Sequence, residues 1–160
     1  MIILMGVAGS GKTTIGKKLA EFLACPFYDA DDFHPPSNKE KMSRSEPLTD
    51  EDRAPWLEAI SKELKGLESG NGLCVLACSA LKQKYRDFLS NDLPVRWVYL
   101  KGSKDLILKR LKARKGHFAD EGLLESQFRD LEEPQNAFVV DIAKDSSEIA
   151  AELLKNFKGA

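Results

Sequence analysis

The sequence is poor in cysteine, carries no excess of one charge and lacks a long apolar run. Three cysteines, Cys25, Cys74 and Cys78, form no even set and contain no C-x-x-C pair. We therefore expect no disulfide framework and no zinc site, only small thiols in a reducing cytosol. The 24 basic residues nearly balance the 25 acidic ones, for a net charge of −1, which gives no reason to expect nucleic acid as a partner.

Signals for membranes and secretion are missing as well. The longest apolar runs are far shorter than the roughly 20 residues that a membrane span needs. The apolar N-terminus has no basic segment and leads directly into a glycine-rich loop, so we do not expect a signal peptide. A chain of 160 residues is typical of one domain. The sequence predicts a single cytoplasmic domain over residues 1–160 that does not bind membranes.

The glycine-rich loop is the most informative motif of the chain. Residues 6–13 read G-x-x-x-x-G-K-T, with Gly6, Gly11, Lys12 and Thr13 at the fixed positions. Four apolar residues before it indicate a short buried strand, and apolar residues at helical spacing follow from Ile15 onward. Strand, glycine loop and helix in this order are the context that a phosphate-binding P-loop requires.

The motif predicts a site for ATP and Mg²⁺. Glycines allow consecutive backbone N–H groups to surround phosphate oxygens, and the helix N-terminus adds its positive dipole end. Lys12 can reach the β- and γ-phosphates, and the Thr13 hydroxyl can bind Mg²⁺. Ser79 stands where a standard Walker B motif has aspartate, so phosphates and waters must complete the metal shell, and Asp29 can hold one of those waters. The expected nucleotide-binding residues of the loop are Gly6, Ala8, Gly9, Ser10, Gly11, Lys12, Thr13 and Thr14.

Segments typical of strands and helices alternate along the chain. Strands are expected at 2–5, 26–28, 73–78, 95–100 and 137–142, each followed by helical spacing. This alternation predicts an α/β fold, the three-layer P-loop kinase fold, with a five-stranded parallel sheet and helices on both faces. The polar insertion at about 33–68 is too long for a simple linker. Within it, Asp50 is expected to cap a long helix that carries Trp56 and Leu57 on its apolar face.

A P-loop alone does not distinguish an enzyme from a nucleotide-driven switch. GTPase switches usually carry D-x-x-G, and no aspartate in this chain has glycine three residues later. The nearest match to the guanine-reading motif N-K-x-D is residues 38–41, where lysine replaces the aspartate. A non-catalytic nucleotide-binding module therefore stays a remote alternative to a kinase.

Several further segments, in order along residues 2–142, resemble the signature of gluconokinases. These segments are His34-Pro35, Asn38 with Lys41-Met42, Pro47-Leu48, Asp50, Asp52-Arg53, Pro55-Trp56-Leu57, residues 78–82, residues 85–87, residues 111–118, Gln127-Phe128, and Leu131-Glu132 with Pro134. One departure is Ser45, where the family usually has glycine before Glu-Pro-Leu, and its side chain is expected to alter the substrate loop slightly.

The resemblance implies a function. Gluconokinases use ATP and Mg²⁺ to phosphorylate the 6-hydroxyl of D-gluconate, giving 6-phospho-D-gluconate, and they are commonly homodimers. They are related to shikimate and nucleoside monophosphate kinases. Another small-metabolite kinase of the same fold, shikimate-like or acting on a nucleoside monophosphate, is the alternative.

The acidic end of the second strand offers the catalytic carboxylate. The resemblance to related kinases, in which the second acid of D-x-D contacts the substrate, favours Asp31 over Asp29 for orienting and deprotonating the attacking hydroxyl. Arg53 and Arg86 match carboxylate geometry and are expected to clamp the gluconate carboxylate, with ion pairs to Asp52 or Asp87 as the alternative.

Other residues are assigned to the substrate or to a lid. His34 and Lys41 can donate to hydroxyls, although Lys41 is equally well explained as a solvated helix residue, and Ser79 and Lys82 follow a central strand near the phosphate. Trp56 fits core packing better than ligand stacking. Five basic residues between 109 and 115 suggest a lid at about 112–123 that brings positive charge to ATP, and the alternative is a basic helix end. The lid residues expected to contact ATP are Arg110 and Arg114, with Lys115 and His117 as weaker candidates.

Overall fold

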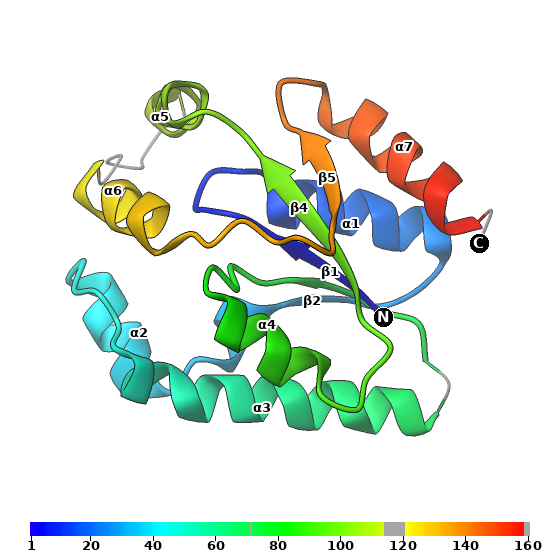
Figure 1. Ribbon diagram of the computed structural model, residues 1–160, viewed down its shortest axis with the longest axis horizontal. Helices are drawn as coiled ribbons and strands as arrows, with labels where there is room; N and C mark the ends of the chain where they lie inside the picture. The colour runs from blue at the N-terminus through cyan, green and yellow to red at the C-terminus, as the bar shows by residue number, and fades with distance from the viewer. Residues whose placement is uncertain (71, 114–120, 159–160) are drawn as a thin grey trace.

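The computed structural model describes residues 1–70, 72–113 and 121–158. Five strands form one parallel sheet in the order β2-β3-β1-β4-β5, which confirms the predicted fold class (Figure 1). The strands are β1 (Ile2–Met5), β2 (Phe27–Asp29), β3 (Val75–Ala77), β4 (Arg96–Lys101) and β5 (Phe138–Asp141).

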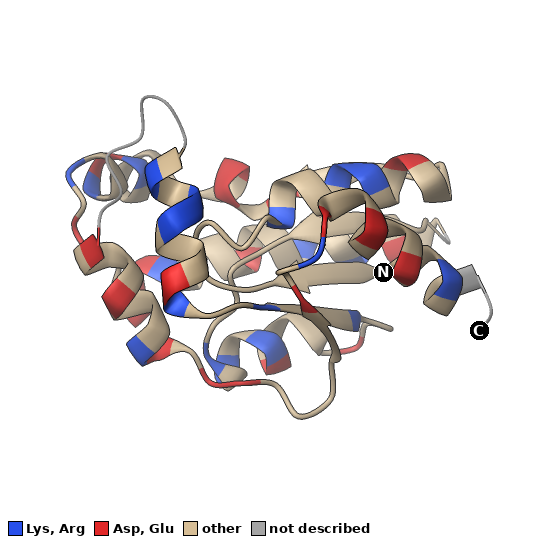
Figure 2. Cartoon of the chain, turned by 90° about the horizontal axis from the view of Figure 1, so that it is seen from above, with Lys and Arg blue, Asp and Glu red and all other residues tan. Residues whose placement is uncertain are grey.

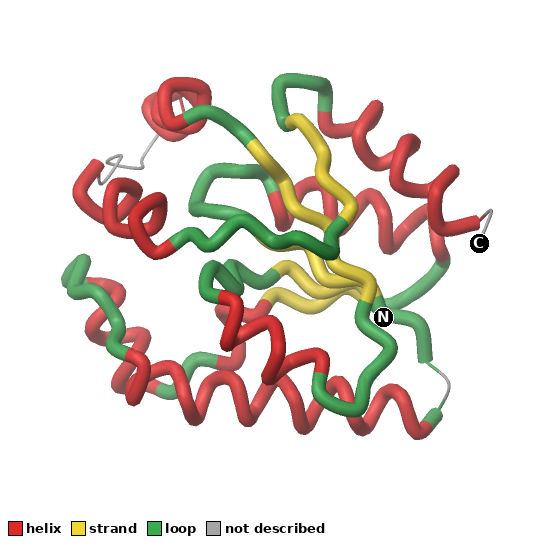
Figure 3. The backbone as a smooth tube through the Cα atoms, viewed as in Figure 1, coloured by secondary structure: helices red, strands yellow, loops and turns green. Residues whose placement is uncertain are grey.

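The helices cover both faces of the sheet and make three layers. They are α1 (Lys12–Leu23), the 3₁₀ helix η1 (Ala30–Phe33), α2 (Pro36–Ser43), α3 (Asp50–Ser69), α4 (Gln83–Ser90), α5 (Lys104–Ala113), α6 (Glu121–Asp130) and α7 (Ser146–Lys158). Helices α3 and α4 lie on one side of the sheet, and α1 and α7 on the other (Figures 1 and 3). In the described ranges, no helix has the length and apolarity to cross a bilayer.

Strand β1 shows how the sequence builds two cores. Side chains alternate across a strand, so Ile3 and Met5 join the core beneath α3 and α4, while Ile2 and Leu4 join the core beneath α1 and α7. All four are buried because parallel strands in the middle of such a sheet are covered on both faces.

Lys and Arg are interspersed with Asp and Glu along the surrounding helices (Figure 2).

The start of α3 differs by one residue from the prediction. Thr49, and not Asp50, is the N-cap: its hydroxyl accepts from the Asp52 backbone N–H, and the Asp52 carboxylate accepts from the Thr49 N–H. This capping box frees the Asp50 side chain for contacts with α4. Pro55 lies within the first turns, where its missing N–H costs little.

The cysteines are reduced. Cys74 and Cys78 flank β3 and are buried, whereas Cys25 is partly exposed. Burial raises the pKa of the Cys78 thiol to about 12, so it stays protonated at neutral pH.

Ser45 ends α2 in a strained conformation. Its φ is +57°, in the left-handed region that favours glycine. The Ser45 N–H donates to the Met42 carbonyl and the Glu46 N–H to the Lys41 carbonyl, which is the pattern of a Schellman motif. The turn geometry explains why glycine is usual at this position, and the serine side chain there carries a conformational cost.

We predict that Ser45→Gly stabilises the protein. Removing the side chain relieves the left-handed strain, which costs a residue other than glycine roughly 1–2 kcal/mol, and the greater entropy of glycine in the unfolded chain offsets about 0.4–1 kcal/mol of this. The free energy of unfolding in urea should rise by roughly 0.5–1 kcal/mol. The matched control is Ser37→Gly, inside α2, which should lower it instead. A Ser45→Gly variant no more stable than the parent contradicts the argument.

Candidate active site

The phosphate loop joins β1 to α1 at the carboxyl end of the sheet. Gly6, Gly9 and Gly11 have φ values of 148°, 79° and 96°, which only glycine adopts without strain. Within the described part of the chain, no acceptor is found for the backbone N–H groups of Gly9, Gly11, Lys12, Thr13 and Thr14. The Ser10 hydroxyl is buried and, within the same ranges, also has no partner. Unpaired polar groups gathered around one loop fit a phosphate anion.

Lys12 lies across this loop. Its Nζ donates to the carbonyls of Gly6 at 2.9 Å and Val7 at 3.0 Å. Burial lowers the pKa of the Lys12 ammonium, and the nearby charges of Asp31 and Asp29 oppose that shift. A lysine held by two weak neutral acceptors is a cation available to a phosphate group.

Asp29 and Asp31 have different surroundings although they are two residues apart. The Asp29 carboxylate accepts from the Thr13 hydroxyl at 2.9 Å and from the Asp31 backbone N–H at 3.2 Å, which caps η1. Among the described residues, no donor contacts the Asp31 carboxylate. Loss of surrounding water and then the charge of Asp29 raise the pKa of Asp31, while Lys12 opposes them. Of the two carboxylates, Asp29 is therefore the one with donors among the described residues, and Asp31 is the one with a raised pKa.

His34 is a neutral, oriented side chain. Its ring stacks on Trp56 with centroids 4.6 Å apart, and the Trp56 indole N–H donates to the Ala30 carbonyl at 2.6 Å. The Asn38 amide nitrogen donates to the Asp52 carbonyl at 2.7 Å and lies 3.3 Å from His34 Nδ1. Since that nitrogen can only donate, Nδ1 is the acceptor and Nε2 carries the proton. Burial, with the charges of Arg53 and Lys39, lowers the pKa of His34 to about 4.

Three cations surround the Tyr85 ring beyond His34. Arg53, Lys82 and Lys84 lie 5.7, 5.9 and 5.7 Å from its centroid. The Tyr85 hydroxyl and Lys84 make short hydrogen bonds to Asp50, and Lys82 lies 3.2 Å from it. These bonds, that of Lys84 first, lower the pKa of Asp50. Of these cations, only Lys82 and Lys84 pair with Asp50, so this group of three cations and one carboxylate has an excess of positive charge.

Lys41 and Arg86, two further residues predicted to bind the substrate, make most of their contacts with the protein. Lys41 pairs with both carboxylate oxygens of Asp52 at 2.8 Å. Arg86 is buried and donates to the carbonyls of Ala80, Leu81 and Glu132 and to the Gln83 side chain. Burial explains the structural use of Arg86: its guanidinium joins the β3–α4 loop to the segment after α6, and neither the carboxylate clamp nor the surface ion pair with Asp87 describes these contacts.

The remaining predicted residues are Ser79, beside the phosphate loop, and the basic residues of α5 and of the segment after it. The Ser79 carbonyl accepts from the Gly6 N–H at 3.4 Å, so Ser79 borders the phosphate loop. Arg110 makes a short hydrogen bond to the Ile142 carbonyl after β5. The predicted lid contacts Arg114, Lys115 and His117 lie outside the described residues, as does most of the lid.

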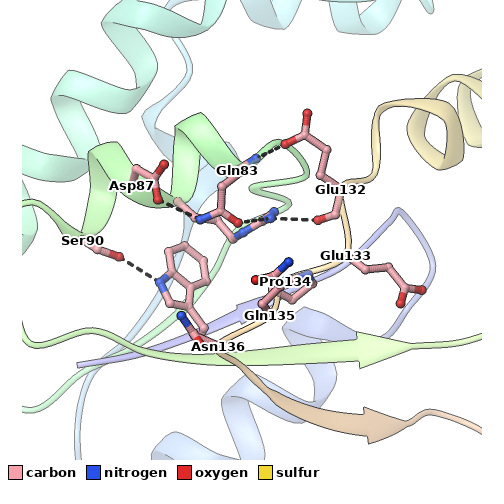
Figure 4. A pocket seen from close by; sticks show the side chains of 10 residues that line it. Gln83, Asp87, Ser90, Glu132, Glu133, Pro134, Gln135 and Asn136 are labelled. Carbon is pink, nitrogen blue, oxygen red and sulfur yellow. Dashed lines mark hydrogen bonds between the residues drawn. The ribbon is translucent and has the colours of Figure 1, made fainter.

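A cavity lies away from these groups. It has a volume of about 490 Å³ and opens between α4 and residues 132–136, beside Trp97 of β4 (Figure 4). None of its lining residues belongs to the phosphate loop or to the cation group around Tyr85. Its walls are joined by hydrogen bonds from Gln83 to Glu132 and from Trp97 to Ser90.

Similarity to known proteins identifies the family. The sequence profile of the shikimate kinase family matches residues 8–158. The thermoresistant gluconokinase of Escherichia coli K12 is 42% identical over 98% of this chain and 92% of its own length. The chain belongs to the gluconokinase family. A solved gluconokinase from Sinorhizobium meliloti 1021 has a TM-score of 0.86 and 40% identity, covering 98% of this chain and 94% of its own.

The more distant likeness concerns the fold alone. Shikimate kinase from Aquifex aeolicus VF5 has a TM-score of 0.66 at 20% identity, covering 99% of this chain and 96% of its own. The match of residues 8–158 to the shikimate kinase profile places this gluconokinase-family chain among the shikimate kinase-like P-loop kinases, as the sequence predicts.

Sequence reasoning missed part of the cation group. The sequence predicts no role for Lys84, and for Asp50 only a helix cap and a place in the gluconokinase-like signature, with no role in the site. The signal was present, because Lys84 adjoins Tyr85 in a segment that resembles the family. Contacts between α3 and α4 cannot be read from either segment alone, and these contacts give both residues their place.

We predict that His34 makes the protein less stable as pH falls. The unfolded chain protonates this ring near its ordinary value of 6.5 but the folded chain only near 4, so between these values the unfolded state binds more protons. The free energy of unfolding should fall by up to about 3 kcal/mol on acidification across this window. Urea titrations at several pH values measure the slope, and His34→Gln should flatten it. Equal slopes in the parent and in His34→Gln oppose the assignment.

Proposed function

We propose that this chain phosphorylates the 6-hydroxyl of D-gluconate to give 6-phospho-D-gluconate. The observation that carries the proposal is one free carboxylate, Asp31, placed beside Lys12 of the phosphate loop, with a cation group beyond it. A substrate with a hydroxyl at one end and a carboxylate at the other matches this arrangement. The names of the relatives point to the same substrate.

The phosphate loop and its neighbours serve the transfer. When MgATP is bound, ATP supplies the γ-phosphoryl group, and its Mg²⁺ ion neutralises part of the phosphate charge. The unpaired N–H groups of Gly11, Lys12 and Thr13 and the Lys12 ammonium hold phosphate oxygens. Asp31 orients the attacking hydroxyl and accepts its proton. Arg110 and Arg114 stay predicted contacts of ATP.

The residues around Thr13 fit Mg²⁺ as well. Thr13 Oγ1 and Asp29 Oδ2 lie 2.9 Å apart on the rim of the loop and offer oxygen ligands, which this ion prefers. In the described ranges, no group of three or more His, Cys, Asp or Glu side chains could hold a metal without help. Phosphate oxygens and water complete the shell, with Asp29 acting through a water.

The cation group binds the other end of the substrate. Arg53 donates one N–H to the Tyr85 hydroxyl at 3.4 Å, and among the described residues its other N–H groups have no acceptor. Its guanidinium can therefore take a carboxylate with two parallel hydrogen bonds, supported by Lys82 and by Lys84. His34, between the two ends, donates to a hydroxyl through Nε2.

The same proposal includes a homodimer as the oligomeric state and the cytoplasm as the location of the enzyme.

Asp31→Asn should retain gluconate affinity and lower kcat by about 10²–10⁴-fold, because the amide keeps the shape but cannot accept the proton. The matched control is Asp32→Asn, one residue further along η1, which should be near normal. Steady-state kinetics with D-gluconate and ATP on both variants checks this. An unimpaired Asp31→Asn would move the base to Asp29.

Gluconate should be phosphorylated far better than glucose, which has the same terminal hydroxyl but no carboxylate to pair with Arg53. Arg53→Gln should raise the KM for gluconate at least tenfold, since a desolvated charge pair is worth about 2–5 kcal/mol. Arg44→Gln, which removes an exposed ion pair in the same insertion, is the control. The coupled assay also tests shikimate and nucleoside monophosphates. Turnover of either, with gluconate inert, overturns the substrate but keeps the kinase.

A further inference from the structure

Gln127, on α6, reaches the phosphate loop from outside it. Its Oε1 accepts from the Ala8 backbone N–H at 2.6 Å, across 119 residues of sequence. The bond fixes the amide orientation, because a flipped amide would set its NH₂ group against the Ala8 N–H. The Nε2 donors must then face away from Ala8. In the described part of the chain no acceptor is found for them.

Helix α6 holds Gln127 firmly in place. Leu124, three residues before, is fully buried, and Phe128 packs against the same core. At the end of α6 the Glu132 N–H donates to the Leu81 carbonyl at 2.9 Å, and Arg86 donates to the Glu132 carbonyl at 2.8 Å. The buried arginine therefore anchors the segment that carries Gln127.

The position of Ala8 indicates which group the Nε2 donors of Gln127 face. Lys12 Nζ lies on the carbonyls of Gly6 and Val7, directly before Ala8. In a P-loop this lysine reaches the β- and γ-phosphates, so the Val7–Ala8 edge faces the phosphoryl group that is transferred. A primary amide with two unpaired donors at that edge suits its equatorial oxygens, on which negative charge is spread during transfer.

We propose that Gln127 is a catalytic residue that donates from Nε2 to the γ-phosphoryl oxygens while its Oε1 stays on the Ala8 N–H. This inference rests on the proposed kinase function and adds a residue to it. The loop thereby orients the side chain that contacts its ligand. The Ala8 N–H fixes the Gln127 amide, and the amide contacts the γ-phosphoryl group, which distinguishes ATP from ADP.

Gln127→Glu separates this role from a structural one. The glutamate keeps an acceptor for Ala8 but replaces the NH₂ donors with a negative oxygen. If Gln127 only supports the loop, this variant should behave like the parent. If it contacts the γ-phosphoryl group, affinity for a nonhydrolysable ATP analogue should fall at least about tenfold, because a donor to a charged group becomes a like charge, while ADP affinity changes less than about threefold.

The experiment combines calorimetry, NMR and kinetics. Analogue and ADP binding are measured on the parent, Gln127→Glu, Gln127→Ala and the charge-matched control Gln135→Glu. The Ala8 amide proton should stay downfield in Gln127→Glu, showing that the loop contact survives, and move upfield in Gln127→Ala. We expect kcat with gluconate to fall more in Gln127→Glu than in Gln127→Ala.

Equal losses of ADP and analogue affinity in Gln127→Glu, or unchanged affinity for both, overturn the proposal. If Gln127→Glu shifts the Ala8 signal as Gln127→Ala does, the contact is not the one described and the proposal also fails. A parent protein that binds both nucleotides but does not phosphorylate gluconate refutes the proposed substrate instead, since the binding comparison needs no gluconate.

Discussion

Unpaired backbone N–H groups around one loop are the constraint on which the site depends. A buried donor without an acceptor costs about 1–3 kcal/mol, and in the described ranges the buried Ser10 hydroxyl has no partner, beside several loop N–H groups that also lack a protein acceptor. Such an arrangement persists because the glycines hold it and because β1, at the centre of the sheet, fixes its start. The loop thus presents polar groups to an anion, and the Lys12 ammonium, which donates to the Gly6 and Val7 carbonyls, adds a positive charge beside them.

The acidic end of β2 divides its work between two carboxylates. Asp29 is used twice by the protein, by Thr13 and by the first turn of η1, and this leaves Asp31 free with a raised pKa. The insertion is ordered in a similar way. Asp52 closes the capping box of α3, pairs with Lys41 and offers its carbonyl to Asn38, so one residue connects α2 to α3. Groups tied up in this manner define which neighbours remain for the substrate.

The sequence predicts what local spacing controls. The five strands, the P-loop and the order of the helices follow from periodicity and one motif, with limits correct to within a few residues. Contacts between distant segments were less predictable. Arg86 looked like a carboxylate clamp because an arginine near a strand end often is, yet its partners are carbonyls of two other segments. Gln127 belonged to a recognisable segment, but nothing in the sequence showed that α6 returns to the loop.

His34 shows why the middle of the site is neutral. Gluconate carries its charge on the carboxylate at one end, and its 6-hydroxyl at the other end accepts the phosphoryl group. The hydroxyls between them need protein groups that can donate and accept hydrogen bonds. A protonated histidine beside Arg53 would add a further cation to the group around Tyr85 and compete with it for the carboxylate. Burial against Trp56 and the repulsion of Arg53 keep the ring uncharged, and Asn38 selects the tautomer that donates from Nε2. In the proposed binding mode, Arg53 would therefore both pair with the gluconate carboxylate and keep the neighbouring His34 ring uncharged.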